Sequence, residues 1–568
     1  MNVHSSWRMQ AANLCDRFPL NRWVGDALRF LRKPSEEFPV WKDYWETNRG
    51  AEFLRKHSWG TNKGKTVLVG TRSSWIYQIK IEAMLALGLR MEGWHPRFLL
   101  RSRRDRWARR YFQAFGFDDF VYWSDYSLNR AERSECKQAA KKLSQGNFGF
   151  TEVKEWSFEG CWIGPQILST VSRGAREGSP DPRDPKVRAQ ILKWLPKTLE
   201  TVRIAGKILD TVKPNLLFMM EPNYASNGPI TDTAVNRGID FIQTAQIARD
   251  DALIFRRLNR KTRREHPSSV ARETLNTVAA GNWTCVEESK LQKEFDSRYS
   301  GEWVLQARNQ PSVQEYSKSN LMQTLGIDPK LKVACIFSHV LWDANLFYGE
   351  DLFEDYGDWF IQTVKAACAN NRVTWLVKLH PANAWKRERQ GVSGQLVEEV
   401  MIRKHIGKLP SHVKLLLPDC PIKNTSLFKV LDYAVTVRGT ISTELPCLGI
   451  PVFTAGTGRC HGMGFTIDSK TRKEYLERMG AIQTQERLSP GVIQRAKFHA
   501  LTIFHHRPWI MKTFRAEFLR NPKGRQALDH NLQLNAASLD EIQANGDLRR
   551  WAEWASDPSK VDYLSQEI

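Results

Sequence analysis

The chain has 568 residues, too many for one hydrophobic core, and 41% of them are apolar, enough to fill the cores of about two large domains. It carries 84 Lys and Arg against 62 Asp and Glu, a formal net charge of +22 that favours an anionic ligand, substrate or surface. This composition argues against long disorder, and the lack of any uninterrupted apolar run of about 18 residues argues against a membrane-spanning segment.

The N-terminal sequence and the cysteines favour the cytoplasm. Residues 1–18 lack the apolar core of a secretory signal. Nine cysteines are scattered without a C-x-x-C pair, and several lie in apolar runs, which is typical of small buried side chains in a reducing compartment. We therefore expect a cytoplasmic protein, whose basic surface would also suit a peripheral position on the inner face of a membrane.

Two basic clusters contribute to the positive charge. Their sequences are LRSRRDRWARR (residues 100–110) and RRLNRKTRRE (residues 256–265), and their apolar interruptions are typical of amphipathic helices. An anionic substrate, an anionic membrane surface and a merely solvated basic surface all fit this pattern. The sequence does not favour nucleic acid as a partner, because it has neither paired Cys/His zinc spacing nor an aromatic RNA-binding strand motif.

The first half of the chain alternates between strands and helices. Residues 1–60 are rich in aromatic and charged residues at helical spacing and predict a helical preface. A strand over Thr66–Val69 is followed by a turn, a helix and a second strand over Arg97–Leu100, and residues 117–125 add a short third strand. Residues 213–245 again read as strand, loop, helix and strand. This pattern predicts a Rossmann-like domain over residues 61–300.

The second half repeats the alternation over residues 301–510. Its predicted strands are KVACIFSHV (332–340), VTWLVKLHP (373–381), HVKLLLP (412–418), YAVTV (433–437) and IPVFTA (450–455). We expect an α/β protein with two Rossmann-like domains that face each other across a cleft, followed by a charged, helical tail over residues 511–568. Ligands of such sheets bind beyond the carboxyl ends of the strands, so the residues after each strand are the candidate site residues.

A turn after the strand at 433–437 suits an anion. Gly439 lets the backbone approach a ligand closely, and the guanidinium of Arg438 suits phosphate oxygens. Thr440 and Ser442 are placed to cap the following helix or to bind the ligand, and Glu444 is placed to accept hydrogen bonds from a sugar or ribose hydroxyl. A capping box made by these same side chains explains the pattern equally well.

A second candidate lies at the end of the strand at 373–381. Lys378 and His380 occupy alternate positions and therefore point to the same face, where both can contact one anion. A lone histidine at a strand end is usually structural. The basic neighbour, together with a second anion-suited turn some 60 residues later, favours a functional reading for this pair.

Two further loops follow strands. Ser338, His339 and Asp343 come after the first strand of the second half and can face the cleft, or serve as turn and cap residues. Glu221 leaves a strand of the first half and is placed to act as a general base, although a loop-tying role fits it as well.

Several nucleotide and metal motifs are missing. The chain has no G-x-x-x-x-G-K-[ST] and so no P-loop signature, and GTRSS (residues 70–74) stands where a G-x-G-x-x-G dinucleotide fingerprint would follow the first strand. No H-E-x-x-H or tight carboxylate cluster indicates a catalytic metal. We therefore expect no metal and no bound cofactor, only a co-substrate.

The motifs VKLHPAN (377–383) and VTVRGTISTELPCLGIPVFTAG (435–456) resemble those of bacterial capsule and surface polysaccharide biosynthesis proteins. These are GT-B-type glycosyltransferases that include Kdo-transferring capsule enzymes and, more distantly, CDP-glycerol polymer transferases. The features that match are His380-Pro381, Thr440, Glu444 and the G-x-P-V over residues 449–452, and the resemblance covers mainly residues 330–470. Arg438-Gly439-Thr440 replaces the serine pair of some members, so CMP, CDP, UDP and GDP all stay open as donor nucleotides.

The resemblance implies a metal-independent glycosyltransferase. It would move a sugar from a nucleotide-sugar donor in the C-terminal domain to a growing capsular or lipopolysaccharide-type glycan, with a glycan or lipid-linked acceptor entering from the N-terminal side. His380 and the turn over residues 438–442 would lie near the donor phosphates. Two alternatives stay open: a CDP-polyol phosphotransferase on the same scaffold, and a non-enzymatic protein that binds nucleic acid or an anionic surface.

The chemistry of transfer suits these residue types. A metal-free enzyme must offset the negative charge on the departing phosphate, and Lys378, His380 and Arg438 are cationic or donor groups suited to that task. An inverting reaction also needs a base for the acceptor hydroxyl, with Glu221 as the first candidate and Asp343 as the second. A retaining mechanism would change this assignment.

Overall fold

The computed structural model describes residues 30–60, 63–176, 178–247, 249–307, 314–343, 346–389, 394–519, 528 and 530–565. Of the helical preface predicted over residues 1–60, the described part forms α3 (Pro34–Gly50) and α4 (Glu52–Lys56). The remainder of that prediction, residues 1–29, lies outside the described residues.

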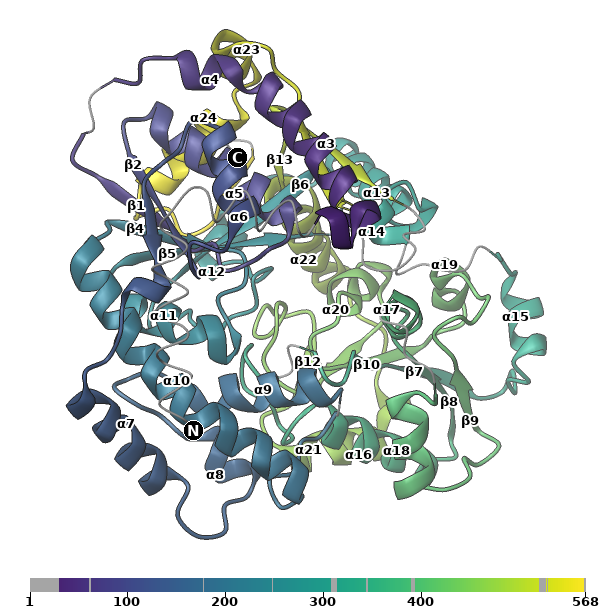
Figure 1. Cartoon of the computed structure of the whole chain (residues 1–568). Helices are drawn as coiled ribbons and strands as arrows, with labels where there is room; N and C mark the ends of the chain where they lie inside the picture. The colour runs from purple at the N-terminus through teal and green to yellow at the C-terminus, as the bar shows by residue number, and fades with distance from the viewer. Residues whose placement is uncertain are drawn as a thin grey trace.

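The N-terminal domain is built on a seven-stranded sheet in the order β13-β6-β5-β4-β1-β2-β3 (Figure 1). Strands β1 to β5 are parallel, whereas β6 and β13 run antiparallel to their neighbours. The bounds are β1 (Thr66–Val69), β2 (His95–Leu100), β3 (Phe120–Tyr122), β4 (Leu216–Met219), β5 (Asp240–Gln246), β6 (Ala252–Leu258) and β13 (Trp509–Ile510).

Helices and turns connect and cover this sheet. They are α5 (Ile76–Met91), α6 (Arg106–Ala114), η1 (Trp123–Asp125), α7 (Arg130–Leu143), α8 (Phe150–Lys154), α9 (Ile163–Ala175), α10 (Pro185–Val212), α11 (Tyr224–Asn236), α12 (Arg272–Ala279), α13 (Cys285–Ser300) and α14 (Val304–Ala307). Helix α5 is buried on nearly every side, because the sheet covers one face and α24 (Asp547–Ser556) the other, where the Trp551 indole donates to the Leu85 carbonyl at 2.9 Å. An all-round apolar sequence suits such a helix.

The C-terminal domain is built on a six-stranded parallel sheet in the order β12-β11-β10-β7-β8-β9. Its strands are β7 (Lys332–Phe337), β8 (Val373–Lys378), β9 (Val413–Leu416), β10 (Tyr433–Thr436), β11 (Val452–Thr454) and β12 (Ile467–Asp468). Its helices and turns are α15 (Lys318–Thr324), α16 (Tyr356–Ala369), α17 (Ala382–Arg389), α18 (Val397–His405), α19 (Asn424–Phe428), α20 (Ile441–Glu444), η2 (Leu445–Leu448), α21 (Arg472–Gly480), η3 (Ile482–Thr484), α22 (Pro490–Leu501) and the π-turn η4 (Thr502–His506). The predicted class, an α/β protein with two Rossmann-like domains that face each other across a cleft, is confirmed.

The C-terminal segment returns to the first domain (Figure 1, yellow). Strand β13 joins the N-terminal sheet beside β6, and α24 packs on α5. Residues 511–568 hold a hairpin, β14 (Phe514–Phe518) with β15 (His530–Leu534), as well as the expected helices α23 (Leu539–Asn545) and α24. This segment therefore completes the N-terminal domain's core.

One basic cluster is not the amphipathic helix that its sequence indicates. Residues 256–258 end strand β6, where Arg256 and Arg257 are buried and bind Asp562 and Asp240. Part of the positive charge of this cluster is therefore buried, and the pair between Arg256 and Asp562 attaches the C-terminal segment to the N-terminal domain. No helix in the described part of the chain is both long enough and apolar enough to cross a bilayer.

Candidate functional site

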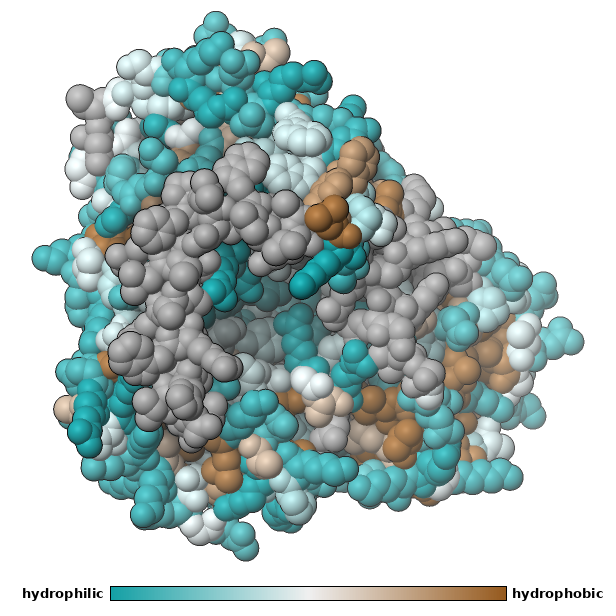
Figure 2. All heavy atoms as spheres, in the orientation of Figure 1, coloured by the Kyte–Doolittle hydropathy of each residue, from teal (hydrophilic) through white to brown (hydrophobic). Residues whose placement is uncertain are grey.

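A cavity of about 670 Å³ opens between the two sheets, and Figure 2 shows the surface hollowed there. The C-terminal domain lines it with residues that follow β7, β8, β10 and β11, and the N-terminal domain lines it with residues from β5, β6 and the loop after β6. The carboxyl ends of parallel strands meet at one edge of a sheet, which explains why these loops converge.

The structure brings most of the candidate residues to this cavity. Its lining includes Ser338, His339, Asp343, Lys378, His380, Arg438, Gly439, Thr440 and Glu444. Two candidates do not line it. Glu221 is exposed, and its carbonyl accepts a hydrogen bond from the Asn227 amide. Ser442 is buried behind the turn and donates to the Gly439 carbonyl at 2.7 Å.

Lys378 and His380 lie together at the end of β8. Lys378 is only 6% exposed, and its ammonium makes no ion pair or hydrogen bond with another residue that the structure describes. Burial lowers the pKa of Lys378, since no carboxylate nearby offsets the desolvation. A buried ammonium without a counter-charge is costly unless a ligand supplies one.

His380 presents a hydrogen-bond donor to the cavity. Its Nδ1 accepts from the Ala382 amide at 3.1 Å, so the proton of the neutral ring lies on Nε2. Burial, helped by Lys386 and Lys378, lowers the pKa of His380 to about 4 and keeps the ring neutral at pH 7. The Ser338 hydroxyl accepts from the His380 amide at 3.1 Å and fixes this loop.

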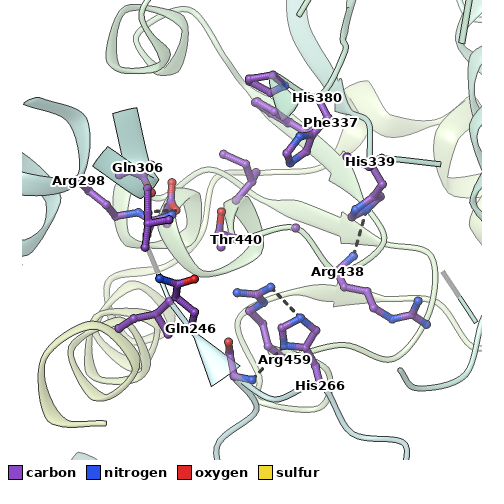
Figure 3. Close-up of a pocket in the computed structure, with 18 of the residues that line it drawn as sticks. Gln246, His266, Arg298, Gln306, Phe337, His339, His380, Arg438, Thr440 and Arg459 are labelled. Carbon is purple, nitrogen blue, oxygen red and sulfur yellow. Dashed lines mark hydrogen bonds and ion pairs between the residues drawn. The ribbon is translucent and has the colours of Figure 1, made fainter. Parts of the chain in front are cut away.

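His339 supports the turn after β10 rather than facing a ligand. Its Nε2 accepts from the Val437 amide at 3.2 Å, and its ring stacks on Tyr356 with centroids 4.4 Å apart. Burial holds the pKa of His339 well below its usual range, so the ring stays a neutral acceptor. Figure 3 shows this imidazole beside the Arg438 backbone.

The side chain of Arg438 points away from the cavity (Figure 3). Its guanidinium pairs with Asp351 and donates to the Thr457 carbonyl at 2.9 Å and to the Tyr356 hydroxyl at 3.1 Å. The backbone of this turn and the side chain of Thr440 are left for a ligand.

The helix after this turn is short. Helix α20 has four residues and continues into the 3-10 turn η2, and Thr440 makes no side-chain cap. Glu444 binds Arg298 at 2.7 Å and accepts from the Tyr299 hydroxyl, so its carboxylate ties α13 to the C-terminal domain. The expected helix-end anion site is therefore weaker than the sequence indicates.

Asp343 connects the two domains. It accepts from Lys386 at 2.6 Å and from the Tyr224 hydroxyl of the N-terminal domain at 2.8 Å. Burial acts to raise the pKa of Asp343, but Lys386 and Arg173 outweigh it and hold the pKa below its usual range. The group is an ionised carboxylate and, at neutral pH, a weak base.

Sequence reasoning missed several polar residues of the cavity, among them Arg459 and His266. Arg459 follows β11 in a glycine-rich loop, and His266 follows β6 at the end of the basic cluster at 256–265. Their places after strands were the only signal in the sequence. Across the described ranges, no three His, Cys, Asp or Glu side chains gather so as to hold a metal ion.

Comparisons with known proteins give distant structural likenesses. No protein-family model and no curated protein matches the chain. Among solved structures it is similar to Thermosulfurimonas dismutans KpsC, a beta Kdo 2,4 transferase, at 13% identity and a TM-score of 0.29, covering 52% of this chain and 81% of that one. It is also similar to the S. aureus MnaA–UDP co-structure, at 10% identity and a TM-score of 0.27, covering 78% of this chain and 92% of that one. A third similar structure is Anabaena Alr3699/HepE in complex with UDP and glucose, at 11% identity and a TM-score of 0.27, covering 78% of this chain and 95% of that one.

Proposed function

We propose that this protein is a glycosyltransferase that moves a sugar from a nucleotide-sugar donor to a growing capsular or lipopolysaccharide-type glycan. The observation that carries the proposal is the buried Lys378, which lines the cavity between the two sheets and lacks a counter-charge among the described residues. Beside it, His380 offers a neutral Nε2–H donor. Together they suit a phosphate group.

In this proposal the nucleotide phosphate binds at Lys378 and His380. When the glycosidic bond to the sugar breaks, negative charge accumulates on that phosphate, and a buried ammonium stabilises it strongly because little water competes. Ser338 positions His380 through the amide contact, and His339 positions the turn after β10. Asp343 is the proposed base for the acceptor hydroxyl, since it lines the cavity whereas Glu221 does not.

A nucleotide panel tests the proposal. The melting temperature is measured with CMP, CDP, UDP and GDP, because a ligand that binds only the folded state raises it. One of these nucleotides should stabilise the protein, and Lys378→Met should lose that shift. Lys332→Met is the matched control, since Lys332 lies at the amino end of β7, on the side of the same sheet away from the cavity.

Transfer is then measured with the sugar nucleotide that the panel selects. A salt-sensitive affinity for DNA or RNA, with no stabilisation by any nucleotide, would replace the proposal with the non-enzymatic alternative. Selection of CDP, with transfer of a polyol phosphate instead of a sugar, would replace it with the phosphotransferase.

A further inference from the structure

The cavity contains more positive than negative charge. Each of its carboxylates has a cationic partner: the pairs are Glu294–Arg249, Asp343–Lys386 and Glu444–Arg298. Two of its other cations, Arg438 and Arg507, face Asp351 and Asp562. Lys378 and Arg459 are the lining cations that form no ion pair within the described part of the chain. The proposed phosphate at Lys378 leaves Arg459 unexplained.

The guanidinium of Arg459 lies against the imidazole of His266, which cannot accept a hydrogen bond from it. Its Nη2 is 3.2 Å from Nε2 of His266, and its buried Nε has no hydrogen-bond partner. The Nδ1 of His266 already accepts from the Ser268 amide at 3.0 Å. A neutral imidazole has a single acceptor nitrogen, so this tautomer puts a proton on Nε2, directly facing the guanidinium.

The imidazole of His266 stays neutral, so a change in its protonation does not remove the contact between the two donors. Burial, together with Arg459 and Arg438, holds the pKa of His266 well below its usual range. Two donors that face each other need an acceptor between or beside them. An oxyanion supplies it, because it can accept from the guanidinium and from the Nε2–H at once.

The two cationic positions are separate. In Figure 3, Thr440 lies between two positions: Arg459 and His266 are on one side of it, and His380 is on the other side. Arg459 belongs to the C-terminal domain, whereas His266 follows β6 of the N-terminal domain. An anion held by this pair would therefore contact both domains, unlike one held by Lys378 and His380.

We propose that Arg459 and His266 form a second anion-binding subsite, which takes a carboxylate or phosphate group of the substrates while Lys378 and His380 hold the nucleotide phosphate. This inference rests on the proposed function for the identity of the first anion. The second anion has two sources: the second phosphate of a nucleoside diphosphate, or an acidic group on the acceptor.

Inorganic phosphate is the probe. In the presence of saturating UMP or CMP, phosphate should raise the melting temperature of the wild-type protein further, because the two anions occupy different subsites. Arg459→Met should weaken this phosphate binding about tenfold or more and leave the mononucleotide shift intact. His266→Asn, which keeps an acceptor for Ser268 but loses the Nε2 donor, should weaken it in the same direction.

Matched controls and a second nucleotide separate the sources. Arg249→Met also removes a lining cation, but one paired with Asp251 and Glu294, and should leave phosphate binding unchanged. If the second anion is a donor phosphate, UDP or CDP will compete with inorganic phosphate and will lose affinity in Arg459→Met. If it belongs to the acceptor, inorganic phosphate will add to the diphosphates as well.

The inference is overturned if phosphate does not stabilise the protein, if its effect disappears on adding UMP or CMP, or if neither Arg459→Met nor His266→Asn weakens it. Failure of the proposed function has a different signature. In that case nucleotides fail to stabilise the protein, while inorganic phosphate still does so through Arg459.

Discussion

The guanidinium of Arg438 is paired with the carboxylate of Asp351, and both side chains are buried, with the guanidinium turned away from the cavity (Figure 3). Arg438→Met leaves Asp351 without its close partner, so we expect a loss of about 3–5 kcal/mol in the free energy of unfolding. Urea denaturation measures this loss. Arg438→Met combined with Asp351→Leu should recover most of it. A single variant with wild-type stability and no nucleotide binding would show that Arg438 is a ligand instead.

Lys378 should lower the stability of the ligand-free protein. Its ammonium is buried without a carboxylate partner in the described residues, and burial lowers its pKa. Lys378→Met keeps the length of the side chain and removes the desolvated charge, so we expect it to raise the free energy of unfolding by about 0.5–2 kcal/mol. The comparison is made without nucleotide. A less stable variant would mean that Lys378 serves the fold and not a ligand.

His380 predicts a loss of stability in acid. Its pKa is lowered from 6.5 to about 4, so between these values the unfolded chain binds a proton that the folded protein does not. Stability from this group is complete above pH 6.5 and falls by about 1.4 kcal/mol per pH unit as the pH decreases towards 4. His380→Asn should reduce the slope of the free energy of unfolding against pH by the equivalent of about one bound proton. Urea denaturation at pH 5 and pH 7 measures this change. An unchanged slope would show that the ring is already protonated when folded.

The carboxylate of Glu398 should make stability depend on pH in the opposite direction. Burial raises its pKa from 4.5 to about 7, so its contribution is complete below pH 4.5 and is lost as the pH rises through 7. Glu398→Gln keeps an acceptor for the Asn383 amide, which donates to Glu398 at 2.6 Å, and cannot ionise. Relative to wild type, the variant should gain up to about 3 kcal/mol between pH 4.5 and pH 8. The same denaturation series measures it, and parallel curves for the two proteins would refute it.

The strands and their carboxyl-end loops could be predicted from sequence, because apolar β-rich runs and helical spacing are local properties. Strand β1 matches its predicted range of Thr66–Val69, and Lys378 and His380 line the cavity as their positions at the end of β8 indicate. Parallel strands explain both results, since their carboxyl ends share one edge of the sheet.

The direction of individual side chains could not be predicted. Arg438 turns away from the cavity because Asp351, 87 residues earlier, receives its guanidinium. His266 reaches the cavity because β6 replaces the helix that its basic cluster indicates, and Arg459 meets it from the other domain. Such contacts depend on tertiary packing, which no local pattern encodes.

Asp343 and Glu221 form a matched pair for identifying the base. Both carboxylates follow a strand, but Asp343 lines the cavity and Glu221 is exposed outside it. If Asp343 takes the acceptor proton, Asp343→Asn should lower kcat for transfer by about 100-fold or more while nucleotide stabilisation persists. Glu221→Gln should retain transfer. Lys386→Met is the control for the lost ion pair, since it removes the 2.6 Å partner and leaves the carboxylate in place. Loss of transfer in Glu221→Gln with retention in Asp343→Asn would reverse the assignment and would require the domains to move so that Glu221 enters the cavity.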